Sequence, residues 1–309
     1  MRVAFLGNDP WSVPPLESLA GSTHELVLVV TRDPRPAGRG GKPRATPVAE
    51  RARAMSLPVL ETPTVKRGPG LDALKEAAPD ILAVVAYGEI LPSEVLRLPR
   101  VAPVNVHFSL LPALRGADPV RRAILDGLEE TGVTTMRMDE GMDTGPVLLQ
   151  SPEPIRPEDT AGSLGDRLAA AGGRLLVDTL DRLEKGDLHE RPQDDAGATM
   201  APKLKQEEEW IDWTEDAESI GRRVRALAPD PGARTRFRDR VVKVLGAAPV
   251  DAEGVGAAGT VLRMSKRELV VAAGRGAVSV DEVVPEGRKP MTGADFARGA
   301  RPEVGERFG

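Results

Sequence analysis

Short apolar runs alternate with amphipathic segments over the first 150 residues of the chain. We expect the apolar runs to be buried strands: Val3–Leu6, Leu26–Thr31, Ile81–Ala86, Val104–His107, Val133–Met138 and Val147–Gln150. Between them, apolar residues recur every three or four positions, which predicts helices: Val13–Ala20, Pro47–Ala54, Leu71–Ala77 and Asp118–Leu125. The alternation predicts an α/β fold with a doubly wound, mostly parallel sheet, whose ligands bind beyond the carboxyl ends of the strands.

The pattern changes beyond about residue 207. Short alternating runs separated by Gly, Pro, Asp and Glu predict strands: Arg240–Leu245, Gly259–Met264, Leu269–Ala273 and Ala277–Val284. A helix, Ala217–Leu227, precedes these runs and a short one, Gly293–Gly299, follows them. We expect a small antiparallel, OB-like β-barrel in this part of the chain.

Between the two patterns, Thr160–Lys185 predicts a closing helix or a bent pair of helices, and the polar stretch Gly186–Thr199 predicts a linker. A length of 309 residues suits two domains. We expect an α/β domain at residues 1–190, a linker at 191–206 and a barrel domain at 207–309.

The composition excludes several kinds of catalytic, metal-binding and membrane-spanning structure. The chain has no cysteine, which excludes disulfides, thiolate nucleophiles and Cys-type zinc sites. No run approaches the roughly 20 apolar residues that span a bilayer, and the apolar start at Val3–Leu6 is too short for a signal peptide, so we expect a cytoplasmic protein. The net charge of −5 gives no overall signal for nucleic acid, so a polyanion would have to meet a local basic surface.

The most informative segment is Asn105-Val106-His107, at the end of the fourth apolar run. Residues two apart on a strand share a face. An amide donor beside an imidazole can stabilise the oxyanion that forms when a nucleophile attacks a carbonyl carbon, and the imidazole can move a proton. Asp143 follows the run Val133–Met138, so its carboxylate can reach the same edge of the sheet and orient the imidazole. These three side chains indicate acyl transfer.

Simpler interpretations of the three residues stay open. Asn105 and His107 could only satisfy backbone groups at the strand end, and Asp143 could be a turn residue. Asp143-Thr144-Gly145 occurs once and in an α/β pattern, whereas an aspartic protease needs two carboxylates that share one proton, so we reject that interpretation. A metal site on His107 and Asp143 lacks a third ligand at an obvious spacing.

Three motifs, in their order and spacing, resemble the folate-dependent formyltransferases: Asn105–Pro112 (Asn-Val-His-Phe-Ser-Leu-Leu-Pro), Arg115-Gly116-Ala117 and Asp143-Thr144-Gly145. The resemblance implies that Asn105, His107 and Asp143 are the catalytic set, with 10-formyl-tetrahydrofolate as the co-substrate and no metal. It also implies a folate site that includes Ser109, Leu110, Leu111 and Pro112, with Tyr87 and Gly88 near the pterin. Ala86-Tyr87-Gly88 is equally compatible with a plain turn after a strand.

The segment Thr31–Lys42 resembles the insert with which family members that formylate methionyl-tRNA contact the acceptor stem. Its Gly and Pro content predicts a flexible segment that orders on a phosphate backbone. The cations expected to contact tRNA are Arg32, Arg35, Arg39, Lys42 and Arg44. As a bare charge run, the segment could also be a solvated loop. It has no Walker-type spacing, because the residue five before Gly41 is Pro36.

The carboxyl-terminal half resembles the same branch of the family at Ala201–Lys205, Trp210–Trp213, Pro231–Ala233 and Asp295–Gly299. Lys203 is a further candidate for contact with tRNA. From Ser219 onward the chain has 17 Lys and Arg against 11 Asp and Glu, a local basic excess. The resemblance therefore implies formyl transfer to the α-amino group of initiator methionyl-tRNA, in support of translation initiation, by a chain that we expect to be monomeric.

Some positions depart from the usual family pattern. Gly7-Asn8-Asp9 replaces Gly-Thr-Pro, Ala117-Asp118-Pro119 replaces Ala-Ala-Pro, and Leu114 replaces an aromatic residue. These changes leave the formyl-transfer set intact but keep a sugar-nucleotide or natural-product amine open as the acceptor. Hydrolysis of the folate and a non-catalytic folate- or RNA-binding role are further alternatives, and the intact set argues against the last. The sequence does not assign the tautomer of His107.

Overall fold

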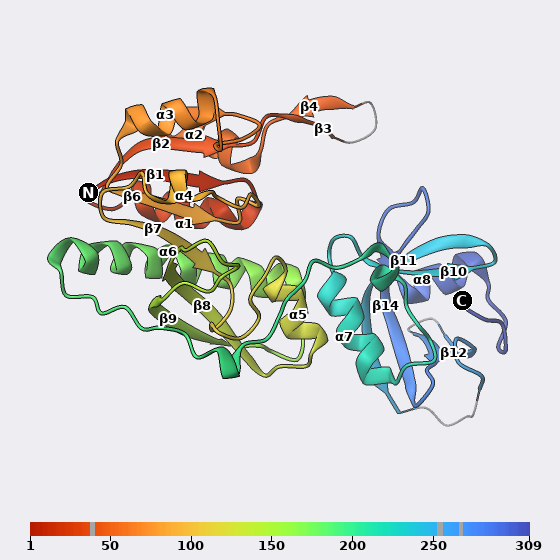
Figure 1. The fold of residues 1–309 in the computed structure, drawn as a ribbon. Coiled ribbons are helices and arrows are strands. Elements are labelled where there is room, and N and C mark those ends of the chain that lie inside the picture. The colour runs from red at the N-terminus through yellow and green to blue at the C-terminus, as the bar shows by residue number, and fades with distance from the viewer. Residues whose placement is uncertain (38–40, 252–255, 266–267) are drawn as a thin grey trace. The chain divides into compact units, whose positions relative to one another are not determined.

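The computed structural model describes residues 1–37, 41–251, 256–265 and 268–309, which form two compact units (Figure 1). The first unit is assembled from three stretches of chain: Met1–Pro119, Glu130–Pro154 and Gly165–Pro202. The second is assembled from three others: Val120–Glu129, Ile155–Leu164 and Lys203–Gly309. Within the described ranges we find no helix with the length and apolar character that a bilayer crossing requires.

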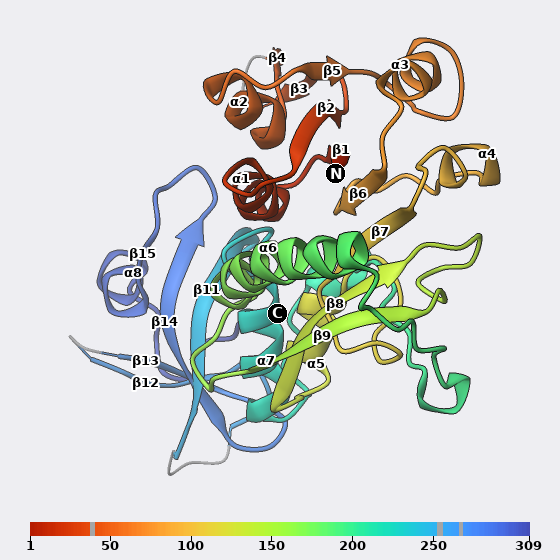
Figure 2. The ribbon, with the colours of Figure 1, turned by 90° about the vertical axis from the view of Figure 1, so that its left-hand side faces the viewer.

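The first unit is built on a seven-stranded sheet whose strands follow one another in the order β5-β2-β1-β6-β7-β8-β9 (Figure 2). Their bounds are β1 Arg2–Gly7, β2 Glu25–Thr31, β5 Val59–Glu61, β6 Ile81–Val85, β7 Ala102–His107, β8 Glu130–Arg137 and β9 Val147–Pro154. Neighbours from β5 to β7 pair in parallel, whereas β8 and β9 pair antiparallel. The predicted α/β fold with a mostly parallel sheet is confirmed, and all six apolar runs are strands.

The helices of this half of the chain are α1 Val13–Ala20, α2 Pro47–Ala54, α3 Pro69–Ala77, α4 Ser93–Leu96, α5 Pro119–Leu125 and α6 Ala161–Lys185. All but the first residue of α5, and the first four residues of α6, belong to the second unit. The start of α2 shows how the sequence sets a boundary. Thr46 caps it, since its side chain accepts a hydrogen bond from Ala49 N at 3.0 Å, and Pro47 occupies the first turn, where no backbone donor is needed.

The segment Thr160–Lys185 forms one continuous helix, α6, and not a bent pair. Two glycines let it approach its neighbours closely. A Cβ on Gly172 would lie 2.9 Å from Val106 Cγ1 of β7, and one on Gly173 would lie 2.3 Å from Ser18 Oγ of α1. Gly172 and Gly173 therefore mark close packing against the sheet and against α1 rather than a break in the helix.

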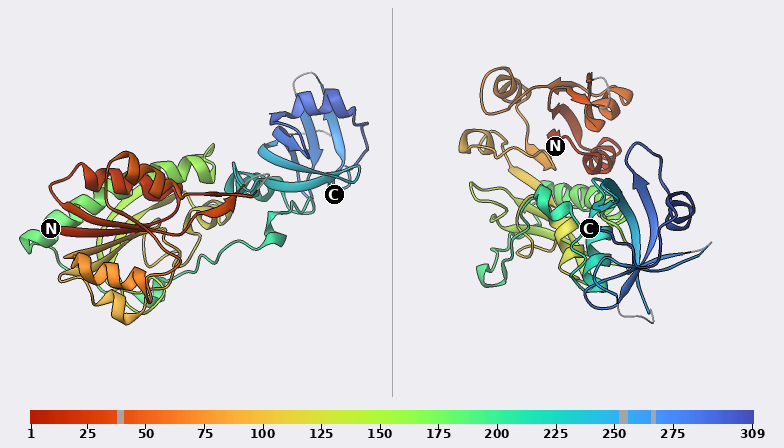
Figure 3. Two further views of the ribbon diagram at one scale, coloured as in Figure 1. Left: turned by 90° about the horizontal axis from the view of Figure 1, so that it is seen from above. Right: turned by 90° about the vertical axis from the view of Figure 1, so that its right-hand side faces the viewer.

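The insert after β2 is more regular than predicted. Residues Arg35–Ala37 (β3) and Lys42–Arg44 (β4) pair as a two-stranded antiparallel hairpin that extends beyond the carboxyl end of β2 (Figures 1 and 3). Pro36 lies opposite Pro43, and since proline has no N–H, this must be a non-hydrogen-bonded pair. These six residues are therefore paired strands within the segment for which the Gly and Pro content predicts flexibility.

The second unit contains an antiparallel sheet in the order β10-β11-β14-β13-β12, with β15 paired to β14. The strands are β10 Ala233–Phe237, β11 Arg240–Val250, β12 Val261–Met264, β13 Leu269–Ala272, β14 Ala277–Pro285 and β15 Met291–Thr292; the helices are α7 Ala217–Leu227 and α8 Gly293–Ala300. The last residues close the sheet on itself, because Phe308 bridges to Phe237 of β10 and Arg307 bridges to Thr260 beside β12. The predicted small antiparallel barrel is confirmed.

The barrel encloses a core in which aromatic rings meet. The rings of Phe237, Phe296 and Phe308 have centroid separations between 4.8 and 6.2 Å, and Trp213 lies 5.8 Å from Phe308. The indole of Trp213 donates its N–H to Thr235 Oγ1 at 2.9 Å, so its polar atom is satisfied although the side chain is buried. Closure and core together explain why short strands suffice here.

Candidate active site

The carboxyl ends of β1, β2, β6 and β7 lie at one edge of the first unit's sheet, because these strands are parallel neighbours. Strand β7 brings Asn105 and His107 to that edge on one face, two residues apart. Asp143 reaches the same place from the loop between β8 and β9. This edge is where ligands bind in open α/β sheets.

The side chains of Asn105, His107 and Asp143 converge. Asn105 Nδ2 lies 3.5 Å from Asp143 Oδ1, and His107 Nδ1 lies 3.7 Å from Asp143 Oδ2. His107 is 5% exposed, and the side chain of Asp143 is 17% exposed. The sequence placed these residues at one edge of the sheet, and the structure brings them to within contact distance of one another.

The hydrogen bonds of His107 assign one of its protons. Its Nε2 lies 2.9 Å from the backbone oxygen of Leu114. A carbonyl oxygen only accepts, so Nε2 must carry a hydrogen. Nδ1 is then the nitrogen that faces Asp143 Oδ2, at 3.7 Å. The structure thus supplies the tautomer that the sequence could not.

Three features fix the position of the loop that carries Asp143: a hydrogen bond to its side chain, its backbone conformation and a close approach at Gly145. Gly116 N donates a hydrogen bond to Asp143 Oδ2 at 2.8 Å. Asp143 itself adopts a left-handed conformation with φ 55°, which aspartate tolerates better than most residues. At Gly145 a Cβ would lie 1.9 Å from Arg137 O, so only glycine fits there. The glycine of the Asp-Thr-Gly motif is therefore a packing requirement.

The residues expected to contact folate lie on two adjacent loops. Segment Ser109–Pro112 follows β7, and the loop Ala86–Gly88 follows β6, its hydrogen-bonded neighbour. Ser109 Oγ donates to Ala113 O at 2.6 Å, and Leu111 N donates to Thr134 Oγ1 at 3.1 Å, which fixes the first loop. The two loops flank the converged trio.

The side chain of Tyr87 is buried and is not available at the surface to contact a ligand. Its side chain is 2% exposed and packs in a core cluster with Val84 and Leu91, and burial raises the pKa of its hydroxyl well above the usual range. Its backbone oxygen accepts a hydrogen bond from Asn8 Nδ2. A contribution of this residue to ligand binding would therefore come from the loop backbone.

Asn8, one of the departures from the family pattern, ties three strand ends together. Its Oδ1 accepts from Thr31 Oγ1 at 2.9 Å and from Arg32 N at 2.7 Å, while its Nδ2 reaches the loop after β6. The guanidinium of Arg32 donates to the backbone oxygen of Gly88. Of the predicted tRNA contacts, Arg32 therefore connects the base of the hairpin to the loop after β6.

The other predicted tRNA contacts are spread over both units. Arg35 and Arg44 lie directly opposite each other across the hairpin, both exposed, and Arg44 Nε lies 3.5 Å from Glu50 Oε1. Lys42 is in β4, and Lys203, an exposed residue, belongs to the second unit. Arg39 lies outside the described residues.

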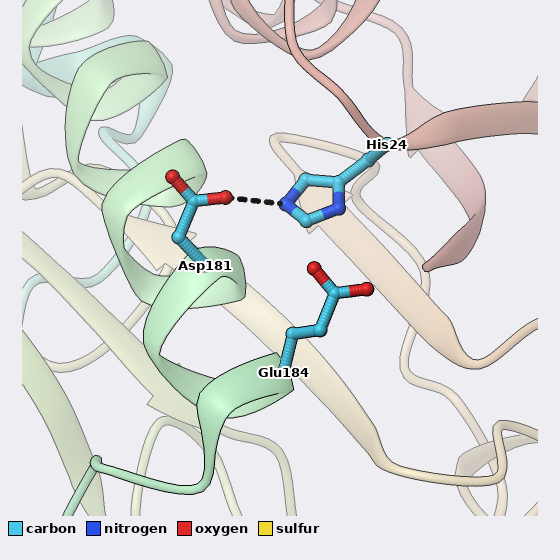
Figure 4. Close-up of side chains that lie close together, drawn as sticks. All are labelled: His24, Asp181 and Glu184. Atoms are coloured by element: carbon cyan, nitrogen blue, oxygen red, sulfur yellow. Dashed lines mark ion pairs between the residues drawn. The ribbon is translucent and has the colours of Figure 1, made fainter.

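A separate cluster could be mistaken for a metal site. His24, Asp181 and Glu184 offer ligand atoms within 4.8 Å of one another (Figure 4). His24 Nε2 pairs with Asp181 Oδ1 at 3.2 Å, and the α-amino group of Met1 lies 3.0 Å from Glu184 Oε1 and 3.2 Å from His24 Nδ1. These contacts tie the loop after α1 to the end of α6.

Several residues that shape the site were not predicted from the sequence. Leu114 O and Gly116 N bond directly to the trio, and Gln193 bonds to the loop of Asp143. Backbone groups leave no signal in side-chain chemistry. Gln193 lies in a polar stretch that is typical of linkers, so nothing in its surroundings distinguishes it.

Comparison with known proteins gives consistent matches over the whole chain. The family described as Formyl transferase matches residues 1–180, and the one described as Formyl transferase, C-terminal domain, matches residues 203–301. A methionyl-tRNA formyltransferase of Solibacter usitatus is 44% identical over 309 residues, covering 100% of this chain and 99% of the relative. Another from Streptomyces coelicolor is 45% identical over 311 residues, covering 100% of both.

Solved structures share the fold at lower identity. HypX from Aquifex aeolicus, in complex with tetrahydrofolic acid, has a TM-score of 0.66 and 21% identity over 99% of this chain and 48% of its own. An N-formyltransferase from Helicobacter canadensis, in complex with folinic acid and dTDP-3-aminofucose, has a TM-score of 0.65 and 16% identity over 90% of this chain and 98% of its own. These two likenesses concern the fold.

Proposed function

The chain belongs to the methionyl-tRNA formyltransferases, a family of folate-dependent enzymes, and on that premise we propose that Asn105, His107 and Asp143 catalyse its reaction. The enzyme transfers the formyl group of 10-formyl-tetrahydrofolate to the α-amino group of initiator methionyl-tRNA. The observation that carries the proposal is the convergence of the trio, with 3.5 and 3.7 Å separating Asp143 from its two partners.

Asn105 and His107 act on the formyl oxygen. When the amine attacks the formyl carbon, that oxygen becomes an oxyanion, and donors already oriented toward it lower the barrier. Asn105 contributes its Nδ2–H. His107 acts through Nδ1, the ring nitrogen beside Asp143, because its Nε2–H is held by Leu114 O.

Asp143 handles the proton of the amine. An α-amino group titrates near pH 8, so a substantial fraction of methionyl-tRNA presents a neutral amine near neutral pH. As the new N–C bond forms, that nitrogen must lose a proton, and Asp143 accepts it directly or through a water. The bond from the folate nitrogen to the formyl carbon then breaks, and Asp143 returns the proton to that nitrogen. No covalent intermediate on the enzyme is required.

The surroundings of the trio fit the folate. Segment Ser109–Pro112 and the loop Ala86–Gly88 follow adjacent parallel strands, so a flat heterocycle placed between them would reach the trio with its attached formyl group. Leu110 and Pro112 are partly exposed and offer apolar contact, whereas Leu111 packs inward against Met136 and Val147. We assign the folate contact to the side chains of Leu110 and Pro112 and to the loop backbone at Ser109, Leu111, Tyr87 and Gly88.

The tRNA is assigned to the cations of the hairpin and of the second unit. Like charges directly opposite on paired strands are destabilising, yet Arg35 and Arg44 face each other in an exposed two-stranded hairpin. A phosphate between them would remove that repulsion and supply two charge-assisted hydrogen bonds. Arg32, Arg39, Lys42 and Lys203 complete the proposed set. We propose further that the enzyme acts as a monomer in the cytoplasm.

Incubation of the purified chain with methionyl-tRNA and labelled 10-formyl-tetrahydrofolate tests the proposal. We expect label on the aminoacyl-tRNA, and little formate when tRNA is omitted. Label on an amino sugar nucleotide but not on methionyl-tRNA would contradict the acceptor. Formate release independent of tRNA would indicate hydrolysis instead. Sedimentation at several protein concentrations tests the monomer, and cell fractionation tests the location.

A further inference from the structure

We propose that Gln193 is a positioning residue that holds the carboxylate of Asp143 in its working place beside His107. The inference rests on the proposed function, since it concerns the same three side chains. Gln193 lies in the stretch that the sequence pattern predicts to be a linker, yet it belongs to the first unit and reaches the loop between β8 and β9.

The nitrogen of the Gln193 amide donates hydrogen bonds to one part of the site, and its oxygen accepts hydrogen bonds from another. Its Nε2 donates to the backbone oxygens of Asp143 at 2.8 Å and Gly145 at 2.7 Å. Its Oε1 accepts from Arg115 Nε at 3.0 Å and Arg115 Nη2 at 2.8 Å. Because a guanidinium only donates, the oxygen of Gln193 must face Arg115, and the two N–H groups must face the carbonyls. The orientation of the amide is therefore fixed.

Gln193 and Arg115 act on two parts of the catalytic loop. Asp143 adopts the left-handed conformation, and the Gln193 amide group binds both its backbone oxygen and that of Gly145, two residues later. Arg115, 7% exposed, is the residue immediately before Gly116, whose N–H binds the Asp143 carboxylate. Gln193 and Arg115 thus link the backbone of the catalytic loop to the group that binds its side chain.

The residues after Gln193 hold the partner of His107 in the same way. Thr199 Oγ1 accepts from Leu114 N at 2.8 Å, and Thr199 O accepts from Arg115 N at 2.9 Å. Leu114 is the residue whose carbonyl binds His107 Nε2. Gln193 and Thr199 therefore hold residues 114–116, whose backbone groups bond to His107 and Asp143.

A replacement of Gln193 can show whether the residue positions Asp143 or only stabilises the fold. Gln193→Glu has the same shape and keeps an oxygen for Arg115, but its carboxylate cannot donate to the two carbonyls and repels them. We expect this variant to keep its unfolding midpoint, because its charge strengthens the contact with Arg115, while kcat falls by about 10- to 100-fold, the loss typical of a 1 Å misplacement. KM for both substrates should stay within about twofold, because no substrate contact is removed.

A matched control uses the other partner of Arg115. Asp195 Oδ1 lies 2.8 Å from Arg115 Nη2, but the side chain of Asp195 is 86% exposed. An exposed ion pair contributes little, so Asp195→Asn should keep kcat within about twofold. Equal losses of kcat in Asp195→Asn and Gln193→Glu would overturn the assignment, since the effect would then come from Arg115 alone.

A second readout does not depend on the acceptor. The chain has three histidines, so the ring nitrogen resonances of His107 can be assigned by NMR with His107→Gln as the reference. In Gln193→Glu we expect the His107 ring signals to shift and those of His24 and His189 to stay. Unchanged His107 signals with wild-type kcat would overturn the proposal. A wild-type enzyme inactive on methionyl-tRNA, with the His107 shift present, would instead count against the acceptor and uphold the positioning role of Gln193.

Discussion

At the residue scale, the sequence could identify the side chains but not the backbone groups around them. Asn105, His107 and Asp143 carry chemistry that only a few residue types possess, so their spacing was informative. Leu114 O and Gly116 N act through atoms that every residue has, and no pattern marks them. Gln193 has a distinctive side chain, but its partners lie some 50 positions earlier in the chain, at Asp143 and Gly145.

One residue-scale prediction concerns Gly145. In Gly145→Ala the new Cβ would meet Arg137 O at 1.9 Å, so the backbone must move and will displace Asp143, two residues earlier. We expect a fall in kcat on the order of 100-fold, the cost of misplacing a catalytic group by about 1 Å. Initial rates, with circular dichroism to verify folding, provide the measurement.

The control for this variant is Gly299→Ala in α8. Among the described residues, no atom beyond its neighbours and the backbone of its own helix lies within 4 Å of the Cβ it would add, and alanine is the better helix former by up to about 1 kcal/mol. Gly299→Ala should be as active as the wild type and no less stable. If Gly145→Ala matched it in rate, the aspartate loop would not need its tight approach to β8.

At the element scale, strongly periodic segments were predicted well and short ones were missed. Helix α7 was predicted at its observed bounds, because its capping residue Asp216 and its apolar periodicity agree. Strand β5 has three residues and strand β3 begins with Arg-Pro, and such segments are too short to show an alternation. Their pairing is set by neighbours distant in sequence, which a local pattern cannot contain.

The hairpin β3–β4 carries a prediction on tRNA binding. If Arg35 and Arg44 each contact a phosphate, Arg35→Ala and Arg44→Ala should weaken tRNA binding and each reduce the slope of log K against log salt by about 1. Folate binding should not change, since neither side chain belongs to the loops beside the trio. Filter binding over a range of salt concentrations measures the slope.

Arg97→Ala is the control for these two variants. Arg97 is also exposed and belongs to the same unit, at the end of α4, but it is not on the hairpin. Its replacement should leave the slope unchanged. A slope that is the same in all three variants would remove the hairpin from the tRNA interface and leave the repulsion between Arg35 and Arg44 unexplained.

At the scale of the whole molecule, the sequence predicted the two folds but not how the chain is shared between the two units. Residues Val120–Glu129 and Ile155–Leu164 belong to the second unit, where Arg122 pairs with Glu208 at 2.7 Å and Gly162 N donates to Ala228 O at 3.2 Å. The sequence pattern also could not predict that Phe308 closes the barrel, because a bridge between residues distant in the chain leaves no periodicity in the sequence.

The lowered pKa of His24 predicts how the stability of the folded protein depends on pH. Burial, and then the positive charge of the Met1 amino group, lower the pKa of His24, against the opposing effect of Asp181 and Glu184. The unfolded chain therefore binds more protons than the folded one as pH falls below about 6.5, so the folded state loses stability. We expect the unfolding midpoint to fall between pH 7.5 and 5.5 and to fall less in His24→Asn.

Chemical denaturation at several pH values measures this effect, and His189→Asn is the control because His189 is exposed. The control should follow the wild-type pH dependence. If His24→Asn also followed it, the buried imidazole would not be the group responsible, and the contact between the loop after α1 and the end of α6 would not depend on its neutral form.

The central claim is that Asn105, His107 and Asp143 act together on one carbon atom, and a double-mutant cycle in single-turnover formyl transfer tests it most directly. Removal of one oxyanion donor typically costs roughly 100- to 1,000-fold. We expect His107→Ala and Asp143→Ala each to lose at least that much while folding normally, and the double variant to lose little more than the worse single one, since residues that act as a unit are not additive. Near-normal rates in His107→Ala, or losses that multiply in the double variant, would contradict the account.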